Sequence, residues 1–152
     1  RYQAEQVGDI EVITHMAKGQ NPVACSRVCD YVSMQPGEKE IILMLDDVFD
    51  AKDSSENIAW IYETDFEFLN HPDIRRIVIG GVRCRDYYLR LLMAGVPRDK
   101  LFCTEQEIEA PELLAYQPGE KIFILHELYA EHLAGRVREK IKAHIREGEE
   151  EA

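Results

Sequence analysis

The chain has 152 residues, and 18 lysines and arginines stand against 29 aspartates and glutamates, so its formal net charge is −11. This length fits one domain with its own core, and 45% hydrophobic with 31% charged residues is typical of a globular rather than a disordered protein. The acidic balance argues against surfaces that bind nucleic acid or anionic membranes, because both are built from lysine and arginine. We therefore expect no nucleic-acid partner. No apolar run approaches the length of a membrane span.

The chain begins with Arg1 rather than methionine, and its polar opening residues do not resemble a signal peptide. We expect a piece of a longer protein with a cytoplasmic location. Its four cysteines form no C-x-x-C pair, and no histidine stands at zinc-finger spacing. The pattern predicts reduced, mostly buried thiols and no metal site; these cysteines are Cys25, Cys29, Cys84 and Cys103.

The first half of the chain alternates between strand and helix patterns. Residues 10–16 predict a strand, and Asn21-Pro22 then predicts the cap and first position of a helix that continues to about Met34. The spacing of Ala24, Val28 and Tyr31 points them inward. Residues 40–45 form a nearly continuous apolar run, which is typical of a strand buried on both faces. Residues 46–59 then predict an acidic loop with four aspartates and one glutamate.

The second half continues the alternation. The patterns predict a short helix over 60–69, strands over 76–79, 101–103 and 121–125, and helices over 83–94, 104–114 and 127–146. Thr104 and Glu107 suggest a capping box for the middle helix of these three. The helix over 83–94 should bury Tyr87, Leu91 and Ala94 and end at Gly95. The last helix should bury apolar residues at helical spacing, and residues 147–152 should fray; the apolar residues are Leu128, Leu133, Val137, Ile141 and Ile145.

Strands that alternate with helices predict a parallel sheet with right-handed crossovers. The fold class is therefore α/β, a Rossmann-like three-layer sandwich of about five mainly parallel strands with helices on both faces. Residues 1–152 are expected to form a single domain.

Ligands of such folds bind at the carboxyl ends of the strands, which residues 46–59, 80–86 and 126–129 should reach. Asp46 and Asp47 directly follow a buried strand, so rigid backbone should position them. The acidic loop can hold Mg²⁺, orient a partner's histidine, contact an amine, or be solvated. The glycines Gly80 and Gly81, with Arg83, can hold an anion at a helix N-terminus, or form a tight turn in which Arg83 pairs with Asp86. Local sequence leaves these alternatives open.

Five blocks of the chain resemble the C-terminal domain of MurT-like relatives of the Mur ligases. Asn21-Pro22 opens the first block, and Leu43–Asp47 is similar to the family's L-x-L-N-D. Residues 58–67 are similar to V-S-W-I-W-D-x-D-F-E, and residues 81–96 to G-x-R-x-x-D-x-A-L-R-L-x-Y-A-G-V. Leu128-Tyr129-Ala130 is similar to the family's Y-T-A segment. These blocks occur in order over nearly the whole chain.

The resemblance implies a role in peptidoglycan precursor synthesis. In that family, the ligase subunit of lipid II isoglutaminyl synthase uses ATP to activate the D-glutamate of lipid II, which would bring it to the inner face of the membrane. Its ammonia comes from glutamine, hydrolysed by a GatD-like glutamine amidotransferase. The C-terminal domain closes over the upstream Mur ligase ATP-binding domain, where ATP and Mg²⁺ are expected, and contacts the amidotransferase. This domain alone is therefore expected to bind no cofactor and to be no catalyst, although the full-length protein would be an ATP-dependent carbon–nitrogen ligase.

The resemblance also assigns residues. An aspartate of this domain is thought to orient the partner's catalytic histidine, and Asp47 and Asp53 are the catalytic candidates. The expected substrate- or partner-binding residues are Asp46, Asn57, Gly81, Arg83 and Asp86. Two positions depart from the family pattern: Asn57 stands directly before the 58–67 block, and Asp46 replaces the asparagine of L-N-D. An amide cannot stabilise an imidazolium as a carboxylate does.

Two functions of other classes remain open from the sequence. The first is a free-standing Rossmann-like binding or interaction module without catalysis. The second is a small nucleotide- or anion-binding enzyme that uses the Gly80-Gly81 turn. No Ser-His-Asp or Cys-His arrangement is evident among the scattered histidines, which argues against a self-contained hydrolase.

Overall fold

The computed structural model describes residues 2–17, 21–46 and 58–151. Its strands are β1 (Tyr2–Val7), β2 (Ile10–Met16), β3 (Lys39–Met44), β4 (Ile74–Gly80), β5 (Leu101–Thr104) and β6 (Lys121–His126). Its α-helices are α1 (Pro22–Met34), α2 (Cys84–Met93) and α3 (Glu131–Glu151). Short 3₁₀ helices connect them: η1 (Ala59–Tyr62), η2 (Phe66–Leu69), η3 (Arg98–Lys100), η4 (Glu107–Leu113) and η5 (Leu128–Ala130).

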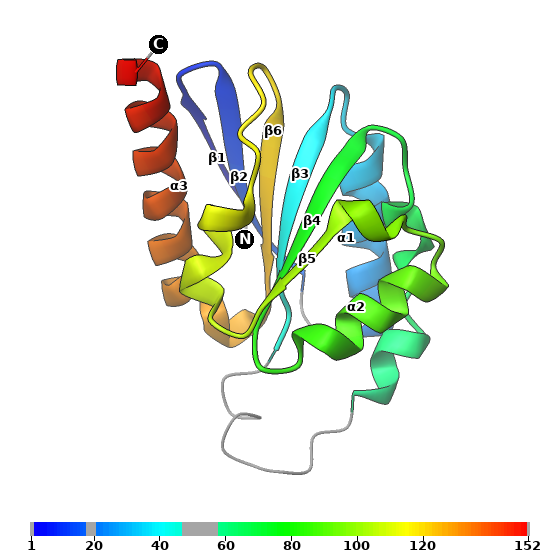
Figure 1. Cartoon of the computed structure of the whole chain (residues 1–152). Coiled ribbons are helices and arrows are strands. Elements are labelled where there is room, and N and C mark those ends of the chain that lie inside the picture. Colours follow the sequence, from blue (N-terminus) through cyan, green and yellow to red (C-terminus); the bar gives the residue numbers. More distant parts are fainter. Residues whose placement is uncertain (1, 18–20, 47–57, 152) are drawn as a thin grey trace.

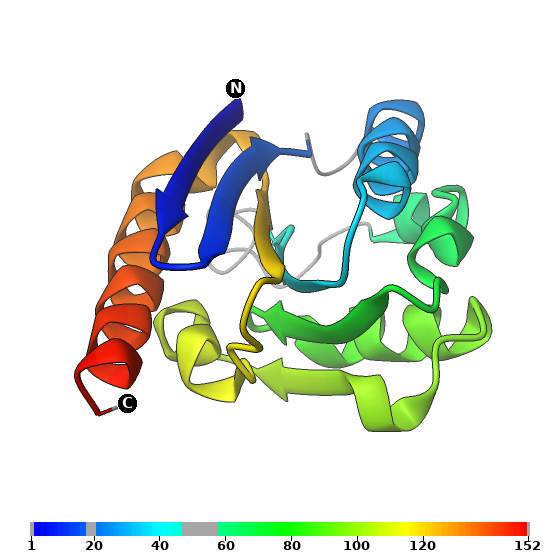
Figure 2. The ribbon, with the colours of Figure 1, turned by 90° about the horizontal axis from the view of Figure 1, so that it is seen from above.

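The strands form one sheet with the order β1-β2-β6-β3-β4-β5, in which β1 alone is antiparallel to its neighbour. Helices α1 and α2 cover one face and α3 covers the other (Figures 1 and 2). The predicted three-layer α/β fold with mainly parallel strands is therefore confirmed, and the sheet has one strand more than the five expected.

Two apolar cores lie on the two faces of this sheet. Ile41 and Leu43 of β3 belong to the core under α1 and α2, whereas Ile42 and Met44 belong to the core under α3. All six residues of β3 are buried, as a strand covered on both faces requires. Side chains that alternate across β3 thus contribute to both cores.

The additional strand is β1, which the polar opening sequence did not indicate. Its six residues pair antiparallel with β2, and Gly8, at φ 59°, makes the tight turn between them. Most of β1 is exposed and only Val7 is buried, so no apolar alternation marks it in the sequence. Pairing with β2, rather than burial, makes this segment a strand.

Helix α1 begins where predicted, but it buries a different face. The Asn21 side chain caps the helix by accepting a hydrogen bond from the Ala24 amide at 3.1 Å. The buried residues are Cys25, Cys29, Val32 and Ser33. Tyr31 is exposed, and Ala24 and Val28 are only half-buried. The buried face of α1 is therefore displaced by about one residue from the predicted one. The four cysteines are free thiols, as predicted.

Other boundaries differ from the sequence patterns. Residues 60–69 form the separate turns η1 and η2 rather than one helix. The predicted capping box is absent, because Thr104 accepts from the Gln106 amide and only the 3₁₀ helix η4 follows. Leu128 is 55% exposed in η5, before α3 begins. Helix α3 extends through Glu151, so residues 147–151, expected to fray, are helical.

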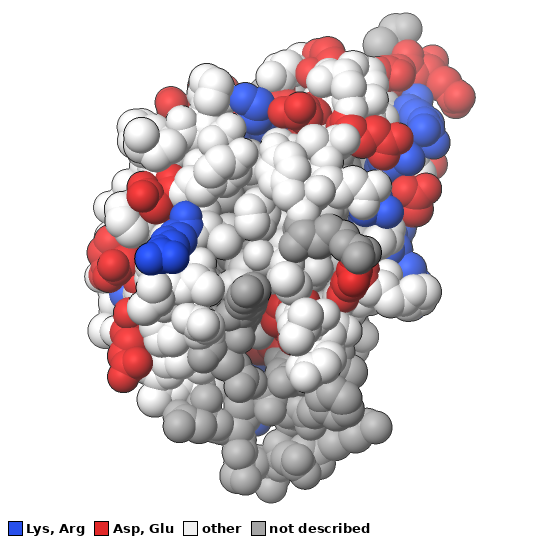
Figure 3. All heavy atoms as spheres, turned by 180° about the vertical axis from the view of Figure 1, so that it is seen from behind, with Lys and Arg blue, Asp and Glu red and all other residues white. Residues whose placement is uncertain are grey.

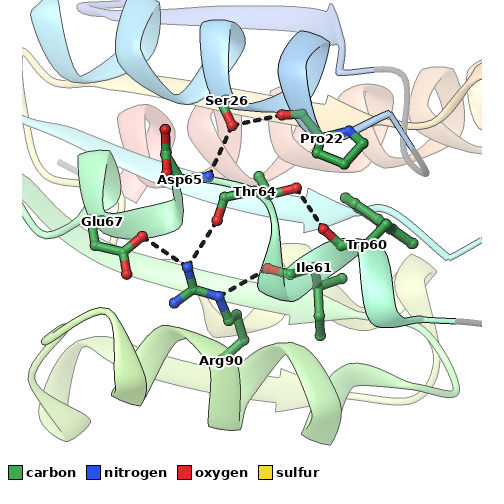
Figure 4. Close-up of polar contacts among 8 residues, drawn as sticks. All are labelled: Pro22, Ser26, Trp60, Ile61, Thr64, Asp65, Glu67 and Arg90. Carbon is green, nitrogen blue, oxygen red and sulfur yellow. Dashed lines mark hydrogen bonds and ion pairs between the residues drawn. The ribbon is translucent and has the colours of Figure 1, made fainter.

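A buried arginine holds η1 and η2 against α2. Arg90, on α2, is 5% exposed and donates hydrogen bonds to the carbonyls of Ile61 (2.9 Å) and Thr64 (2.8 Å) and to Glu67 (2.8 Å). Figure 4 shows the guanidinium between the two segments. This ion pair also lowers the pKa of Glu67. Arg90 therefore satisfies backbone carbonyls that the short 3₁₀ turns leave without a partner.

Replacing Arg90 tests the importance of this contact. Arg90→Met keeps most of the apolar stem but leaves two buried carbonyls without donors, so we expect a loss of about 3 kcal/mol in the free energy of unfolding. Arg85→Met, at an exposed position of the same helix, should change it by less than about 0.5 kcal/mol. Urea denaturation measures both; equal stabilities of the two variants would contradict the assigned role.

Two buried carboxyl groups lie close together at the amino edge of the sheet, where the parallel strands β3 and β6 begin. Glu40 and Glu120 are 0% and 3% exposed. The Glu40 carboxylate accepts hydrogen bonds from the amides of Ala115 (2.8 Å) and Tyr116 (3.0 Å) and lies 3.6 Å from the Arg76 side chain. Burial, followed by the neighbouring Glu40 carboxylate, raises the pKa of Glu120 to about 10. Glu120 is therefore protonated at neutral pH.

This raised pKa makes stability depend on pH. Between the ordinary glutamate pKa of 4.5 and about 10, the unfolded chain releases the Glu120 proton while the folded chain retains it. The stabilising contribution is thus complete below about pH 4.5 and is lost as the pH rises toward 10. Glu120→Gln mimics the protonated group, so its stability relative to the wild type should increase between pH 5 and pH 9 in urea titrations. Glu147→Gln, at an exposed site, is the control, and a difference that stays constant with pH would refute this explanation.

Candidate functional site at the carboxyl edge of the sheet

The chain reverses its direction of winding between β3 and β6. The connection that follows β3 leads to the face covered by α1 and α2, whereas α3, which follows β6, covers the other face. The carboxyl ends of both strands lie at the lower edge in Figure 1. Ligands of open α/β sheets bind at such a switch point, so Asp46 and Glu127, which follow these two strands, lie where a site is expected.

Asp46 is positioned by the turn that opens α2. Its Oδ2 accepts a hydrogen bond from the Arg83 amide at 2.8 Å. Gly81, at φ 124°, lies so close that a Cβ atom there would be 2.3 Å from the same oxygen. Both conformation and space thus disfavour a residue with a side chain at position 81. The structure brings Asp46, Gly81 and Arg83 together, as predicted from their places at this edge.

This contact distinguishes between the two interpretations of the Gly80-Gly81 turn. The Asp46 carboxylate takes the amide at the N-terminus of α2, where an external anion would otherwise bind. The turn is therefore structural, and the carboxylate that accepts from the Arg83 amide is that of Asp46. Asp86 lies half-buried in the first turn of α2, where its charge complements the helix dipole.

The other predicted site residues cannot be placed. Asp47, Asp53 and Asn57 lie outside the described residues, so their roles stay predictions.

Two glutamates that sequence reasoning did not assign to the site approach Asp46. Glu127 is 4% exposed, and its amide donates to the carbonyl of Met44, which ties the end of β6 to the end of β3. Burial raises the pKa of Glu107, and the nearby carboxylates of Asp46 and Glu127 raise it further. Glu107 comes from η4, far away in the sequence, and its spacing from Thr104 suggested only a helix cap. No local signal identifies it.

Two histidines lie near this edge. His126, at the end of β6, hydrogen-bonds through Nδ1 to the Glu127 carbonyl (2.8 Å), and His15 of β2 does the same to Met16 (3.0 Å). Burial lowers the pKa of both imidazoles. Within the described ranges, no group of three or more His, Cys, Asp or Glu side chains has a geometry that would hold a metal ion.

The sequence model of the MurT ligase C-terminal family matches residues 19–130. The chain belongs to this family. The matched range contains α1, α2, strands β3 to β6, the 3₁₀ helices η1 to η5 and the cluster of Asp46, Glu107 and Glu127. This MurT-type C-terminal domain of the Mur ligases therefore carries its candidate site within the part that defines the family.

Curated relatives support the same assignment. The chain is 33% identical over 87 residues to the MurT subunit of lipid II isoglutaminyl synthase (glutamine-hydrolyzing) from Staphylococcus aureus, covering 57% of this chain and 18% of that protein. It is 27% identical over 126 residues to the same subunit of Streptococcus pneumoniae, covering 82% of this chain and 27% of that protein. This domain thus spans less than a third of the length of these relatives.

Solved structures show the same fold. MurF ligase from Thermotoga maritima in complex with ADP matches with a TM-score of 0.60 at 12% identity, over 97% of this chain and 31% of that one. A domain of a putative muramate ligase from Haemophilus ducreyi matches with a TM-score of 0.60 at 14% identity, over 95% of this chain and 99% of that one. In the part of the MurT C-terminal domain that the structure describes, no helix is long and apolar enough to cross a membrane.

The contact between Asp46 and Gly81 predicts a coupled effect of two substitutions. Gly81→Ala should destabilise the domain by roughly 1–3 kcal/mol, because the added methyl group meets both a positive φ and the Asp46 carboxylate. Gly37→Ala is the matched control, since Gly37 has φ 90° but no atom within 4 Å of its added Cβ, and should cost about 1 kcal/mol.

Repeating Gly81→Ala in an Asp46→Ala background should remove the steric part and leave a cost near that of Gly37→Ala. Urea denaturation of the wild type, the two single variants and the double variant forms the required double-mutant cycle. Additive effects of Asp46→Ala and Gly81→Ala would show that the two residues do not constrain each other.

Proposed function

We propose that this chain is the C-terminal domain of a ligase subunit that amidates the D-glutamate of lipid II during peptidoglycan synthesis. The match of residues 19–130 to the MurT ligase C-terminal family is the observation that carries this proposal. The names of the S. aureus and S. pneumoniae relatives add the substrate, the hydrolysis of glutamine and the subunit role. A cytoplasmic location follows from this assignment.

The upstream Mur ligase domain would bind ATP and Mg²⁺, which activate the D-glutamate carboxylate. The C-terminal domain would close over that domain with the carboxyl edge of its sheet. Asp46, Gly81, Arg83 and Asp86 would shape this edge, and Asn57 would face the substrate or the partner. The contact between Asp46 and the Arg83 amide supports a shaping role, because it fixes the turn that opens α2.

Ammonia would come from a GatD-like glutamine amidotransferase bound to this domain. Asp47, and after it Asp53, is the proposed catalytic aspartate that orients the partner's histidine. A carboxylate suits this task, because it holds the imidazole in one tautomer and stabilises the imidazolium. The domain would thus contribute one residue to the glutamine-hydrolysing site while the chemistry on lipid II takes place at the upstream domain.

Reconstitution separates these two tasks. The full-length ligase subunit should be purified with its GatD-like amidotransferase, and lipid II amidation should be measured with glutamine and, separately, with ammonium chloride. Asp47→Asn or Asp53→Asn should lower glutamine-driven amidation by at least about 100-fold, within the range seen for groups that orient a catalytic histidine, and leave ammonium-driven amidation unchanged.

Asp99→Asn is the control, since Asp99 is an exposed aspartate at the amino edge of the sheet. Wild-type glutamine-driven rates in both loop variants would refute the assigned aspartates. A wild-type pair that amidates lipid II with neither nitrogen source would refute the proposed function.

A further inference from the structure

A pocket of about 370 Å³ lies at the amino edge of the sheet, between the turn that joins β1 to β2 and the last turns of α3. Figure 1 shows these two segments at the edge opposite the carboxyl ends of β3 and β6. None of Asp46, Glu107 and Glu127 lines this pocket. It is therefore separate from the candidate site at the carboxyl edge, and its volume is typical of sites for small molecules.

A pair of stacked rings forms one wall of the pocket. The Tyr116 ring lies on the His144 imidazole, with ring centroids 5.2 Å apart and ring planes 12° apart. The Tyr116 hydroxyl donates a hydrogen bond to the Pro111 carbonyl (2.7 Å), and its amide donates one to the buried Glu40 carboxylate (3.0 Å). The His144 Nε2 lies 3.2 Å from the Glu112 carboxylate. Both rings are thus positioned by the protein before a ligand binds, which lowers the cost of binding.

The backbone at this wall is strained. Tyr116 has φ 54°, and among the described residues it alone has a positive φ without being a glycine. A bulky residue adopts this conformation at a cost in free energy, so the surrounding contacts must hold it there. Glu40 does so, because its carboxylate accepts from the Ala115 amide (2.8 Å) as well as from that of Tyr116. Strained residues are concentrated at ligand sites, so the strain at Tyr116 indicates a binding function for the wall that its ring forms.

The inner surface of the pocket is apolar. Ile10 of β2 and Ile145 of α3 both line it and are 3% and 5% exposed. Gly148, three residues further along α3, also lines the pocket, and a Cβ atom added there would have no atom within 4 Å. The missing side chain therefore leaves the space open. Apolar side chains beside two rings favour a ligand with an apolar body, because binding removes that body from water.

The rim of the pocket is acidic. Asp9, in the β1–β2 turn, and Glu149, in the last turn of α3, are exposed and line it, and no lysine or arginine is among its described lining residues. Neither carboxylate forms an ion pair with a described residue. Acidic side chains gather at this end of α3 (Figure 3). A cation at the rim would therefore be attracted by both carboxylates, and an anion would be repelled.

We propose that this pocket binds a small organic amine with an apolar body about the size of one ring. The body lies against the Tyr116 and His144 pair, and the ammonium group lies at the rim near Asp9 and Glu149. This inference does not depend on the proposed function, because none of the residues assigned to that function lines the pocket. The apolar surface supplies most of the binding free energy, and the carboxylates select the sign of the ligand's charge.

The probe for this site is phenethylamine, added to the full-length protein that contains this domain. Saturation-transfer NMR detects binding, and a titration gives Kd. We expect saturable binding with a Kd below about 10 mM, as for a ligand of nine non-hydrogen atoms. Phenylacetate, which carries a carboxylate on a similar body, should bind at least about tenfold more weakly. Absence of saturable phenethylamine binding would overturn the site.

A substitution at Gly148 tests the place of binding. Gly148→Phe extends into the open space without meeting a neighbouring atom at its Cβ, so it should fill the pocket and weaken phenethylamine binding by at least about tenfold. Ala143→Phe is the matched control, because Ala143 is exposed on the same helix and does not line the pocket. Neither change removes a buried side chain, and urea denaturation verifies that both variants fold.

Charge substitutions test the class of ligand. Asp9→Asn with Glu149→Gln should weaken phenethylamine binding by at least about threefold and remove most of the preference over phenylacetate. Asp99→Asn with Glu147→Gln is the control, since both residues are exposed and neither lines the pocket. Wild-type Kd in Gly148→Phe would overturn the pocket as the binding site. Equal binding of phenethylamine and phenylacetate to the wild type would overturn the assignment to amines.

Discussion

The buried guanidinium of Arg90 is the interaction on which the arrangement of this domain depends. In the described part of the connection between β3 and β4, residues 58–73, the turns η1 and η2 rather than an α-helix cover the sheet. Trp60 and Phe66 of these turns pack around Tyr87 of α2, with ring centroids 6.1 to 6.5 Å apart. Aromatic packing alone leaves polar carbonyls beside the core, and Arg90 satisfies two of them. The layer under α1 and α2 is complete because of this contact.

The same contact joins two of the sequence blocks that resemble the family. Residues 58–67 contribute the carbonyls and Glu67, and residues 81–96 contribute Arg90 and the turn at Gly81. One end of the second block holds Asp46 at the carboxyl edge, and the first block lies beside α1. The proposed site at the carboxyl edge and the η1–η2 segment beside α1 are therefore supported by one packing unit.

Much of the fold could be predicted because its signals are local. The apolar run of β3, the Asn21 cap and the glycine after α2 each depend on residues that are neighbours in the sequence. Strand β1 could not be predicted, since only its pairing with β2 distinguishes it from a polar tail. The predicted inward face of α1 was wrong because the apolar and cysteine stripes are adjacent on the helix, and Cys25 and Cys29 pack inward in place of Tyr31.

In the site, Asp46, Gly81 and Arg83 could be predicted from their place at the ends of strands. Glu107 could not, because only the tertiary fold brings η4 to Asp46.

Amide hydrogen exchange in the Arg90→Met variant tests most directly the claim that this arginine holds the η1–η2 segment against α2. The amides of Asp65 and Phe66, which bond to Ser26 and Thr64, report on the segment itself, and those of β3 report on the sheet. We predict that Arg90→Met lowers the protection of Asp65 and Phe66 by at least about tenfold more than that of β3. The reason is that the η1–η2 segment, without its contact to Arg90, opens before the sheet does. Equal losses of protection in the two regions would contradict this account, since Arg90 would then contribute only to global stability.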